Sequence, residues 1–168
     1  MDQDQMQKEK FLESYDSYAD AIFRYCLIRV YDREKARDLT QDVFIRAWDY
    51  IVSGKEVEHW KAFLYRIATN LIIDNARRKH ELISLETLME TGFDPGKDDR
   101  SHVDDYIDGQ KAVAAINDLG EIYREPVYLR YVEDMSPAEI AEITGVSENV
   151  VSVRIHRGLY QLKRKLKQ

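Results

Sequence analysis

The chain has 168 residues, of which 44% are hydrophobic and 33% charged, so it can bury a core and present a charged surface to water. Its apolar runs are shorter than the roughly 20 residues that a membrane span needs, and its polar N-terminus lacks the apolar core of a secretory signal. The net charge of −6 excludes a uniformly basic protein, and the single cysteine, Cys26, excludes an internal disulfide and a cysteine-rich zinc site.

Three long helices are predicted in the first eighty residues, at about 8–31, 33–52 and 57–80, because apolar residues recur there at helical spacing. The first glycine is Gly54 and the first proline is Pro95, so no helix breaker occurs in the opening fifty residues. Cys26 has apolar and aromatic neighbours in the first of these helices, and we expect it to be a buried, unreactive thiol.

The helix at 33–52 has an apolar residue on its polar side. Its predicted core-facing stripe consists of Ala36, Leu39, Val43, Phe44, Ala47 and Ile51. On the opposite side, Ile45 is surrounded by Asp38, Gln41, Asp42 and Asp49. This pattern is typical of a small protein-docking patch, although a single exposed apolar residue is also common on any protein surface.

The helix at 57–80 carries polar and basic side chains along one flank. That flank consists of Arg66, Asn70, Ile73 and Arg77, and the helix ends in Arg77, Arg78 and Lys79. One explanation is that the cations complement the negative end of the helix dipole. Arginine and asparagine beside aromatic residues are also what unstacked bases need for stacking and edge hydrogen bonds, and the aromatic residues here are Trp60, Phe63 and Tyr65. We expect most of these aromatic side chains to lie in the core.

Residues 81–110 differ from the rest of the chain in charge and in composition. They contain 2 basic and 9 acidic residues, a net charge of −7, whereas residues 1–80 are neutral and residues 111–168 carry +1. They also contain Gly92, Pro95, Gly96 and Gly109, which disfavour regular structure. We therefore predict a flexible acidic linker at 81–110 between two domains, residues 1–80 and 111–168.

Helical spacing resumes in QKAVAAINDL and IYREPVYLRYVED, where Pro126 must occupy the first turn of its helix or kink it. The final segment, MSPAEIAEITGVSENVVSVRIHRGLYQLKRKLKQ, predicts a short helix, a turn at Gly145 and a longer helix capped by Ser147. Ile140, Val151 and Ile155 would face inward, as in a helix-turn-helix. Because no segment alternates convincingly at period two, the predicted fold is all-α, with two small helical domains.

The outer face of the last predicted helix suits a DNA major groove. It carries small, polar and basic side chains, namely Asn149, Ser152, Val153, His156, Arg157 and Tyr160. From Arg154 onward every charged residue is basic, which suits phosphates beside the groove. The alternative is a basic amphipathic helix of an ordinary bundle, because helix-turn-helix shapes also occur in proteins that do not bind DNA.

The sequence offers no catalytic or metal-binding set. Its histidines are scattered without metal-ligand spacing, at His59, His80, His102 and His156. It contains neither a glycine-rich phosphate loop nor a nucleophile with a matching base. We therefore expect a protein that is not an enzyme and that needs no metal or cofactor.

Three segments resemble, in order and spacing, the bacterial ECF (extracytoplasmic function) sigma factors of RNA polymerase. They are DLTQDVFIRAW (38–48), WKAFLYRIATNLIIDNARR (60–78) and YREPVYLRYVEDMSPAEIAEITGVSENVVSVRIHRGLYQLKRKL (123–166). The last segment alone also resembles output domains of response regulators, but the three together cover nearly all of the predicted folded chain. The resemblance implies an alternative sigma factor that directs promoter-specific transcription initiation, with region 2 at 1–80 and region 4 at 111–168.

The resemblance also implies a role for each candidate surface. The part of region 2 that docks on the β′ clamp helices of core RNA polymerase corresponds to Asp38, Gln41, Asp42 and Ile45. Asn70 corresponds to an asparagine that holds a base flipped out of the −10 element, and residues 53–59 correspond to the loop that cradles this base. The DNA near the melted bubble would lie along Arg66, Arg77 and Arg78. The positions that recognise the −35 element correspond to Asn149, Ser152, Val153, His156 and Arg157.

The implied partners are core RNA polymerase (β′ clamp helices and β flap), promoter DNA and a cognate anti-sigma factor. The implied location is the cytoplasm, with no membrane insertion, although an anti-sigma factor could hold the protein at the membrane. The chain departs from the family at residues 149–152, Asn-Val-Val-Ser, where Gly-Thr-Val and a basic residue are common. Gly158 is a second departure and costs about 1 kcal/mol of helix stability relative to alanine.

Two other classes of protein fit parts of the sequence. A stand-alone helix-turn-helix regulator would bind a palindrome as a dimer without polymerase. A helical adaptor or anti-sigma-like module would not need its basic residues to bind DNA.

Overall fold

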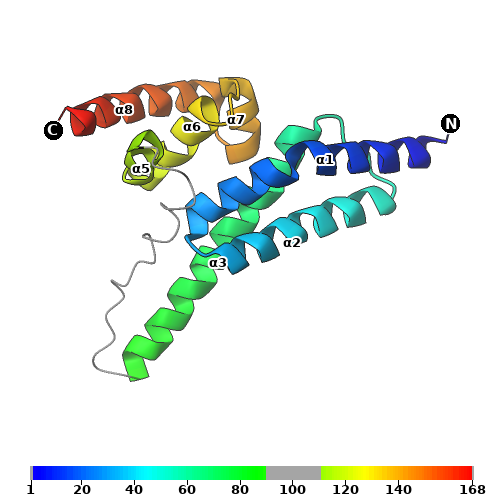
Figure 1. Cartoon of the computed structure of the whole chain (residues 1–168), viewed down its shortest axis with the longest axis horizontal. Coiled ribbons are helices and arrows are strands. Elements are labelled where there is room, and N and C mark those ends of the chain that lie inside the picture. The colour runs from blue at the N-terminus through cyan, green and yellow to red at the C-terminus, as the bar shows by residue number, and fades with distance from the viewer. Residues whose placement is uncertain (1, 90–110, 168) are drawn as a thin grey trace. The chain divides into compact units, whose positions relative to one another are not determined.

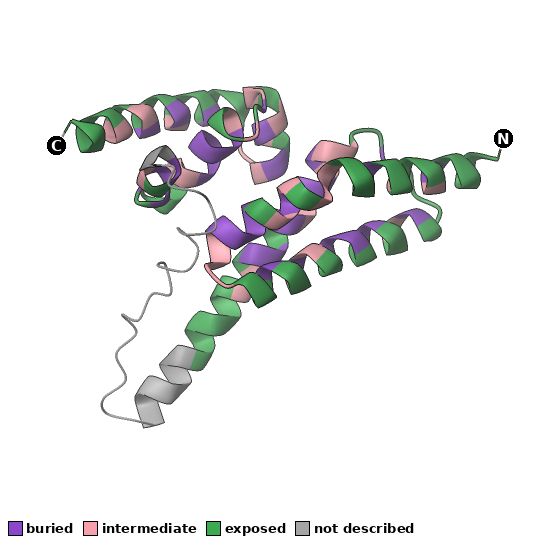
Figure 2. Cartoon of the chain, in the orientation of Figure 1, coloured by how far each residue is buried: buried purple, intermediate pink, exposed green. Residues whose placement is uncertain are grey.

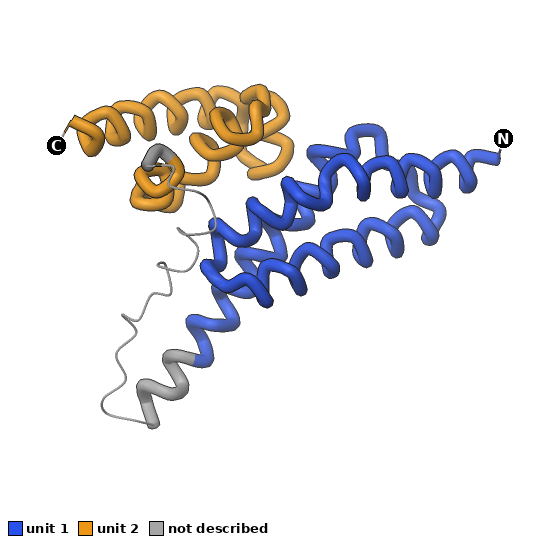
Figure 3. Tube along the Cα trace, in the orientation of Figure 1, with its two compact units in different colours: residues 1–103 blue, residues 104–168 orange. Residues whose placement is uncertain are grey.

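The computed structural model describes residues 2–89 and 111–167, and the side chains of residues 2–82 and 113–167. Within those ranges every regular element is an α-helix and no strand occurs, so the predicted all-α class is confirmed (Figure 1). Buried residues follow one side of each amphipathic helix, as Figure 2 shows. The chain divides into two compact units, Met1–Val103 and Asp104–Gln168 (Figure 3).

The first unit contains α1 (Gln3–Val30), α2 (Arg33–Val52) and α3 (Trp60–Met89). α1 and α2 lie side by side, and α3 packs against both (Figure 1). The hydroxyl groups of Tyr25 and Thr69 share a buried hydrogen bond of 3.0 Å, which ties α1 to α3. The core of the unit includes the fully buried residues Ile22, Tyr25, Leu27, Val43, Leu64 and Tyr65.

The turn between α1 and α2 explains why α2 begins where the sequence predicts. Tyr31 adopts a left-handed conformation with φ 56°, and its N–H donates to the Leu27 carbonyl, which ends α1. The carboxylate of Asp32 then accepts hydrogen bonds from the N–H groups of Glu34 and Lys35, at 3.0 and 3.2 Å. Such a cap stabilises a helix by about 1 kcal/mol, and it fixes the first residue of α2.

The predicted bounds of the other two long helices were wrong. α1 begins at Gln3 rather than near residue 8, because its first turns contain no helix breaker and Asp4 pairs with Lys8 at 2.8 Å. α3 begins at Trp60 rather than near residue 57, and it continues to Met89, into the predicted linker. Residues 81–89 contain no glycine or proline and several good helix formers, so the helix has no reason to stop earlier. The rest of the predicted linker, 90–110, lies outside the described residues.

Cys26 is buried in α1, as predicted. Burial raises the pKa of its thiol to about 12, and a hydrogen bond with Thr40 lowers that pKa by a smaller amount. The reactive thiolate is therefore scarce at neutral pH, and the sulfur behaves as a small apolar group.

The second unit contains α5 (Lys111–Asn117), α6 (Glu121–Tyr131), α7 (Pro137–Thr144) and α8 (Glu148–Leu166). α8 packs against each of the other three helices. The unit has its own core, which includes Val113, Ile116, Leu119, Val127, Leu129, Met135, Ile140, Val151 and Ile155.

α7 and α8 form the predicted helix-turn-helix. Ser136 and Glu139 form a reciprocal capping box at the start of α7. Gly145 ends α7 with φ 76°, a left-handed conformation that glycine adopts without strain. The side chain of Ser147 accepts a hydrogen bond from the Val150 N–H at 3.2 Å and so caps α8, as predicted.

α6 contains a proline and a buried carboxyl side by side. Pro126 lies in the interior of α6 rather than in its first turn, so it cannot donate to the Ile122 carbonyl one turn earlier. The neighbouring Glu125 is 9% exposed, and burial raises the pKa of its carboxyl to about 8. The fold therefore favours the neutral form of this side chain.

Gly158 has a packing role that outweighs its low helix propensity. A Cβ atom at this position would lie 2.5 Å from Val127 Cγ2 and 3.3 Å from Tyr123 Cβ, both on α6. No real Cβ atom comes as close to a neighbour as 2.5 Å. The missing side chain thus permits the close approach of α8 to α6.

We predict that Gly158→Ala destabilises the second unit by roughly 1–2 kcal/mol. The alanine gains about 1 kcal/mol of helix propensity, but forcing a methyl group into a packed core typically costs about 1–3 kcal/mol and here meets a β-branched side chain. Urea unfolding of the full chain, followed through NMR signals of α6 and α8, measures the change. In a Val127→Ala background the same substitution should be neutral or stabilising. A gain in stability on the wild-type background would contradict this packing role.

We predict that Glu125→Gln stabilises the second unit at pH 8 and removes part of its pH dependence. Because the folded pKa of about 8 lies above the ordinary value of 4.5, the folded state binds more protons in this range. The free energy of unfolding of the wild type should therefore fall as pH rises from about 4.5 to about 8. The same NMR-detected unfolding measures the free energy of unfolding at pH 5 and at pH 8. At pH 8 we expect this free energy to be about 1 kcal/mol or more higher in the variant than in the wild type, with a smaller difference at pH 5. An equal change in the free energy of unfolding at pH 5 and pH 8 would show that ionisation of the Glu125 carboxyl does not cause the pH dependence.

Candidate functional site

The outer face of α2 has the geometry that the sequence predicts. Asp38, Gln41 and Asp42 are exposed, and the apolar Ile45 in their midst is 57% exposed. The opposite stripe of α2, from Ala36 to Ile51, is buried against α1 and α3. The structure therefore brings these four side chains together on one accessible surface.

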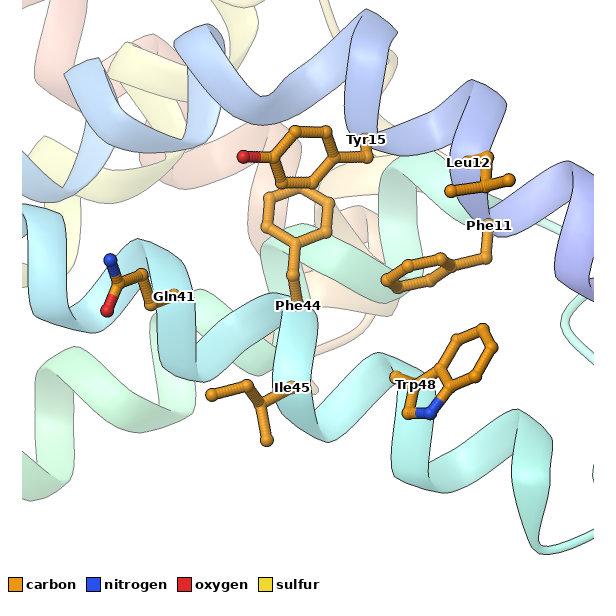
Figure 4. Close-up of a pocket in the computed structure, with 7 residues that line it drawn as sticks. All are labelled: Phe11, Leu12, Tyr15, Gln41, Phe44, Ile45 and Trp48. Carbon is orange, nitrogen blue, oxygen red and sulfur yellow. The ribbon is translucent and has the colours of Figure 1, made fainter.

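This surface borders an open apolar groove between α1 and α2, which the sequence analysis missed (Figure 4). The groove has a volume of about 500 Å³. It is lined by Phe11, Leu12, Tyr15, Gln41, Phe44, Ile45 and Trp48. Leu12 and Tyr15 are 62% and 50% exposed, so part of this lining contacts water.

Aromatic packing gives the groove its floor. The Tyr15 ring lies 4.8 Å from the Phe44 ring, and the Phe11 ring lies 5.2 Å from that of Trp48, all between ring centroids. Each pair is edge-on, a favourable arrangement worth roughly 0.5–1.5 kcal/mol beyond its burial. A pocket with an apolar floor and acidic neighbours suits an apolar side chain from a partner that carries positive charge around it.

The flank of α3 is accessible over its whole predicted length. Arg66, Asn70, Arg77 and Arg78 are exposed, and the intervening Ile73 is 51% exposed. Arg77 pairs with Asp74 at 2.7 Å, on the helix surface. These side chains therefore form a polar and basic strip.

The aromatic residues near this flank differ in burial. Tyr65 is fully buried, and its ring packs against Tyr25 at 5.3 Å, so it cannot stack on a base. Trp60 and Phe63 are half-buried and pack against each other at 6.0 Å. We expected most of these rings to lie in the core, but only that of Tyr65 does, because Trp60 and Phe63 lie in the first turn of α3, where burial is partial.

The loop at 53–59 connects α2 to α3. Gly54 has φ 91°, and the hydroxyl of Ser53 donates to the Tyr50 carbonyl at 2.6 Å. Val57 is only 5% exposed, whereas its neighbours Glu56 and Glu58 are exposed. One buried valine thus anchors a loop whose other side chains contact solvent.

The outer face of α8 also has the predicted composition. The exposed residues Asn149, Ser152, Val153, His156 and Arg157 share this face, while Val151 and Ile155 are buried against the rest of the unit. Arg154 is half-buried and lies to the side. The basic residues near the end of the helix, Lys163, Arg164 and Lys165, are exposed.

Two further kinds of site are absent from the described part of the chain. Among those residues, no group of three or more histidine, cysteine or carboxylate side chains could hold a metal ion. Over the same residues, no helix is both long and apolar enough to cross a membrane.

Comparison with known proteins identifies the two units. Residues 14–81 match the family Sigma-70 region 2, and residues 110–162 match Sigma-70, region 4. Over 171 aligned residues the chain is 31% identical to the ECF RNA polymerase sigma factor SigW of Bacillus subtilis, and the alignment covers 95% of this chain and 90% of that protein. The chain belongs to the ECF sigma factor family.

Other relatives agree with this assignment. This sigma factor is 27% identical over 155 residues to the ECF RNA polymerase sigma factor SigL of Mycobacterium tuberculosis, covering 92% of this chain and 87% of that one. Its fold is similar to that of the sigma factor RpoE from Bartonella quintana, solved in complex with the anti-sigma factor NepR. The TM-score is 0.74 at 22% identity, over 95% of this chain and 98% of the other.

Membership of the family establishes the general activity. This protein is an alternative sigma factor, which directs transcription by RNA polymerase. Sigma factors are not catalytic enzymes, and the stand-alone regulator and the adaptor module are thereby set aside. The surfaces of α2, α3 and α8 are the places to seek its contacts.

Proposed function

We propose that this sigma factor docks on the β′ clamp helices of core polymerase through Asp38, Gln41, Asp42 and Ile45, while its region 4 contacts the β flap. The observation that most directly supports this docking is the exposed Ile45, which lies among carboxylates and beside an apolar groove. An apolar centre with a charged rim is the usual anatomy of a protein interface. The groove extends the contact surface from α2 onto α1.

The −10 element is recognised by α3 and the loop before it. Asn70 hydrogen-bonds a base that has left the stack, and residues 53–59 surround that base. Arg66, Arg77 and Arg78 contact the DNA backbone near the melted segment. Support for this role comes from the accessible strip on α3 and from the buried anchor, Val57, that holds the loop.

The −35 element is recognised by the outer face of α8, with Asn149, Ser152, Val153, His156 and Arg157 toward the bases. A helix of this composition can donate and accept hydrogen bonds in the major groove and can contact a thymine methyl group through Val153. Asn149 and Ser152 replace the more basic start common in the family, so the specificity of this protein should depend on them.

Polymerase supplies the geometry that the free chain lacks. Extruding a base costs a few kcal/mol, which contacts to the flipped base and to single-stranded DNA can offset. Because residues 1–80 have no net charge and residues 111–168 carry only +1, the isolated protein gains little non-specific attraction to DNA. Core polymerase holds region 2 and region 4 at the separation of the two promoter elements, and the two weak contacts then act together.

We also propose that a cognate anti-sigma factor sequesters this protein by covering one or both DNA- and polymerase-binding surfaces. Support comes from the RpoE–NepR complex, whose sigma factor has the same fold. The protein acts in the cytoplasm, where an anti-sigma factor embedded in the membrane could retain it. It has no catalytic role and needs no cofactor.

We predict that Asp42→Arg weakens binding to core polymerase by roughly tenfold or more, because it reverses a charge beside the apolar centre of the docking face. Titration of labelled core polymerase measures the affinity. Glu13→Arg is a matched control, since Glu13 is exposed on α1 and, at about 100° per residue, points away from Phe11 and Tyr15 of the groove. Equal affinities for Asp42→Arg and wild type would remove this face from the docking site.

We predict that Asn70→Ala lowers the rate of promoter opening by roughly tenfold while leaving polymerase affinity unchanged. The substitution removes the hydrogen bonds that offset base extrusion but leaves the α2 face intact. Permanganate footprinting of the melted strand with holoenzyme measures opening. The control is Asn75→Ala on the same helix, about 140° around its axis from Asn70. Normal opening by the Asn70 variant would refute its contact with the base.

A further inference from the structure

The first turns of α1 contact the α2–α3 loop through one stripe of side chains. Gln3, Gln7 and Phe11 are four residues apart, so they lie above one another on the same side of the helix. All three precede residue 14, where the match to region 2 begins. The stripe therefore belongs to a part of α1 to which the family match assigns nothing.

Each residue of the stripe contacts the loop or its end, in parallel order. The amide of Gln3 donates a hydrogen bond to the carboxylate of Glu56. The backbone N–H of Val57 donates to Gln7 Oε1 at 3.3 Å. The Phe11 ring then packs edge-on against Trp60, the first residue of α3, with 6.1 Å between the ring centroids.

The central contact of the three is buried. Gln7 is 7% exposed and Val57 is 5% exposed, so water has little access to the hydrogen bond between them. A buried backbone N–H that loses its acceptor is destabilised much more than an exposed one, because it cannot turn to solvent. The side chain of Gln7 thus supplies to Val57 the acceptor that a helix or a strand would otherwise provide.

A small cavity lies between the stripe and the loop. Its volume is about 130 Å³. It is lined by Gln3, Asp4, Gln7, Ile51, Gly54, Lys55 and Glu56. Gly54, with φ 91°, gives the loop a backbone conformation that few residues share. The N–H groups of Ser53 and Gly54 bond back to carbonyl groups of α2, and beyond Gly54 the contacts from α1 help to hold the loop in one shape.

We propose that Gln7 is a positioning residue for the loop at 53–59 and so determines how strictly this sigma factor selects the flipped base of the −10 element. Gln7 does not touch DNA, because it is buried beneath the loop; it acts through the Val57 backbone. The proposal rests on the proposed role of this loop as the base pocket. It assigns the selectivity of region 2 in part to the N-terminal turns of α1.

The first test measures the loop in the isolated full-length protein. Gln7→Met keeps the length and volume of the side chain but removes the acceptor oxygen. Gln5→Met is the matched control, because Gln5 is exposed on the same helix. In hydrogen exchange detected by NMR, we expect the Val57 amide to exchange roughly tenfold faster in the Gln7 variant and unchanged in the control. Unchanged exchange at Val57 in Gln7→Met overturns the proposal.

The second test measures base selection by the holoenzyme. The wild-type holoenzyme first selects a promoter from a randomised library. Four versions of this promoter are then prepared, which differ only in the base at the flipped position. We expect Gln7→Met to reduce the preference for the best base over the others by roughly fivefold, with polymerase affinity unchanged. Gln5→Met should keep the wild-type preference.

The Asn70→Ala variant in the same assay separates the positioning role of Gln7 from the proposed −10 role of region 2. If it alters opening and base preference while Gln7→Met does not, the loop is a base pocket but Gln7 does not position it. If Asn70→Ala has no effect on opening at any of the four promoters, the proposed −10 role itself fails. Loss of polymerase affinity by Gln7→Met, with normal base preference, would assign the residue to docking instead and would also overturn the proposal.

Discussion

The packing of Phe11 holds α1, α2 and the start of α3 in a fixed relation. Its ring contacts Phe44 and Trp48 of α2, at 6.2 and 5.2 Å, and Trp60 at the start of α3, at 6.1 Å. Edge-on aromatic pairs add to the stabilisation that burial provides, so this cluster fixes α1 on both neighbours. The same side chain lines the apolar groove and completes the stripe beneath the loop. The surfaces that we propose for docking and for base recognition therefore share one structural support.

Charge is distributed unevenly along the chain. Carboxylates surround Ile45 on α2, whereas α8 has only basic charges from Arg154 onward. Residues 81–110 carry a net charge of −7 and so account for the whole net charge of −6. The charge of the whole chain thus says little about its DNA-binding surfaces, because screening in physiological salt limits each field to about 8 Å.

Local chemistry made much of this structure predictable from the sequence. The start of α2 follows from the Asp32 cap, and the helix-turn-helix follows from Gly145 and the cap at Ser147. The ends of α1 and α3 were misplaced because helix formers without breakers give no signal where they should stop. The groove was not predictable from one helix at a time, since Leu12 and Ile45 come to line one groove only when α1 packs on α2. Gly158 was interpreted as a cost because Val127, which explains it, lies on another helix.

We propose that core polymerase and this protein together recognise two separate promoter elements. In vitro transcription from a randomised promoter library, with core polymerase and the full chain, tests this claim most directly. We expect transcripts to begin downstream of two short motifs at one fixed spacing, and we expect the isolated chain to bind the selected DNA weakly. Tight sequence-specific binding by the isolated chain, or transcripts without a shared two-part motif, would contradict the account.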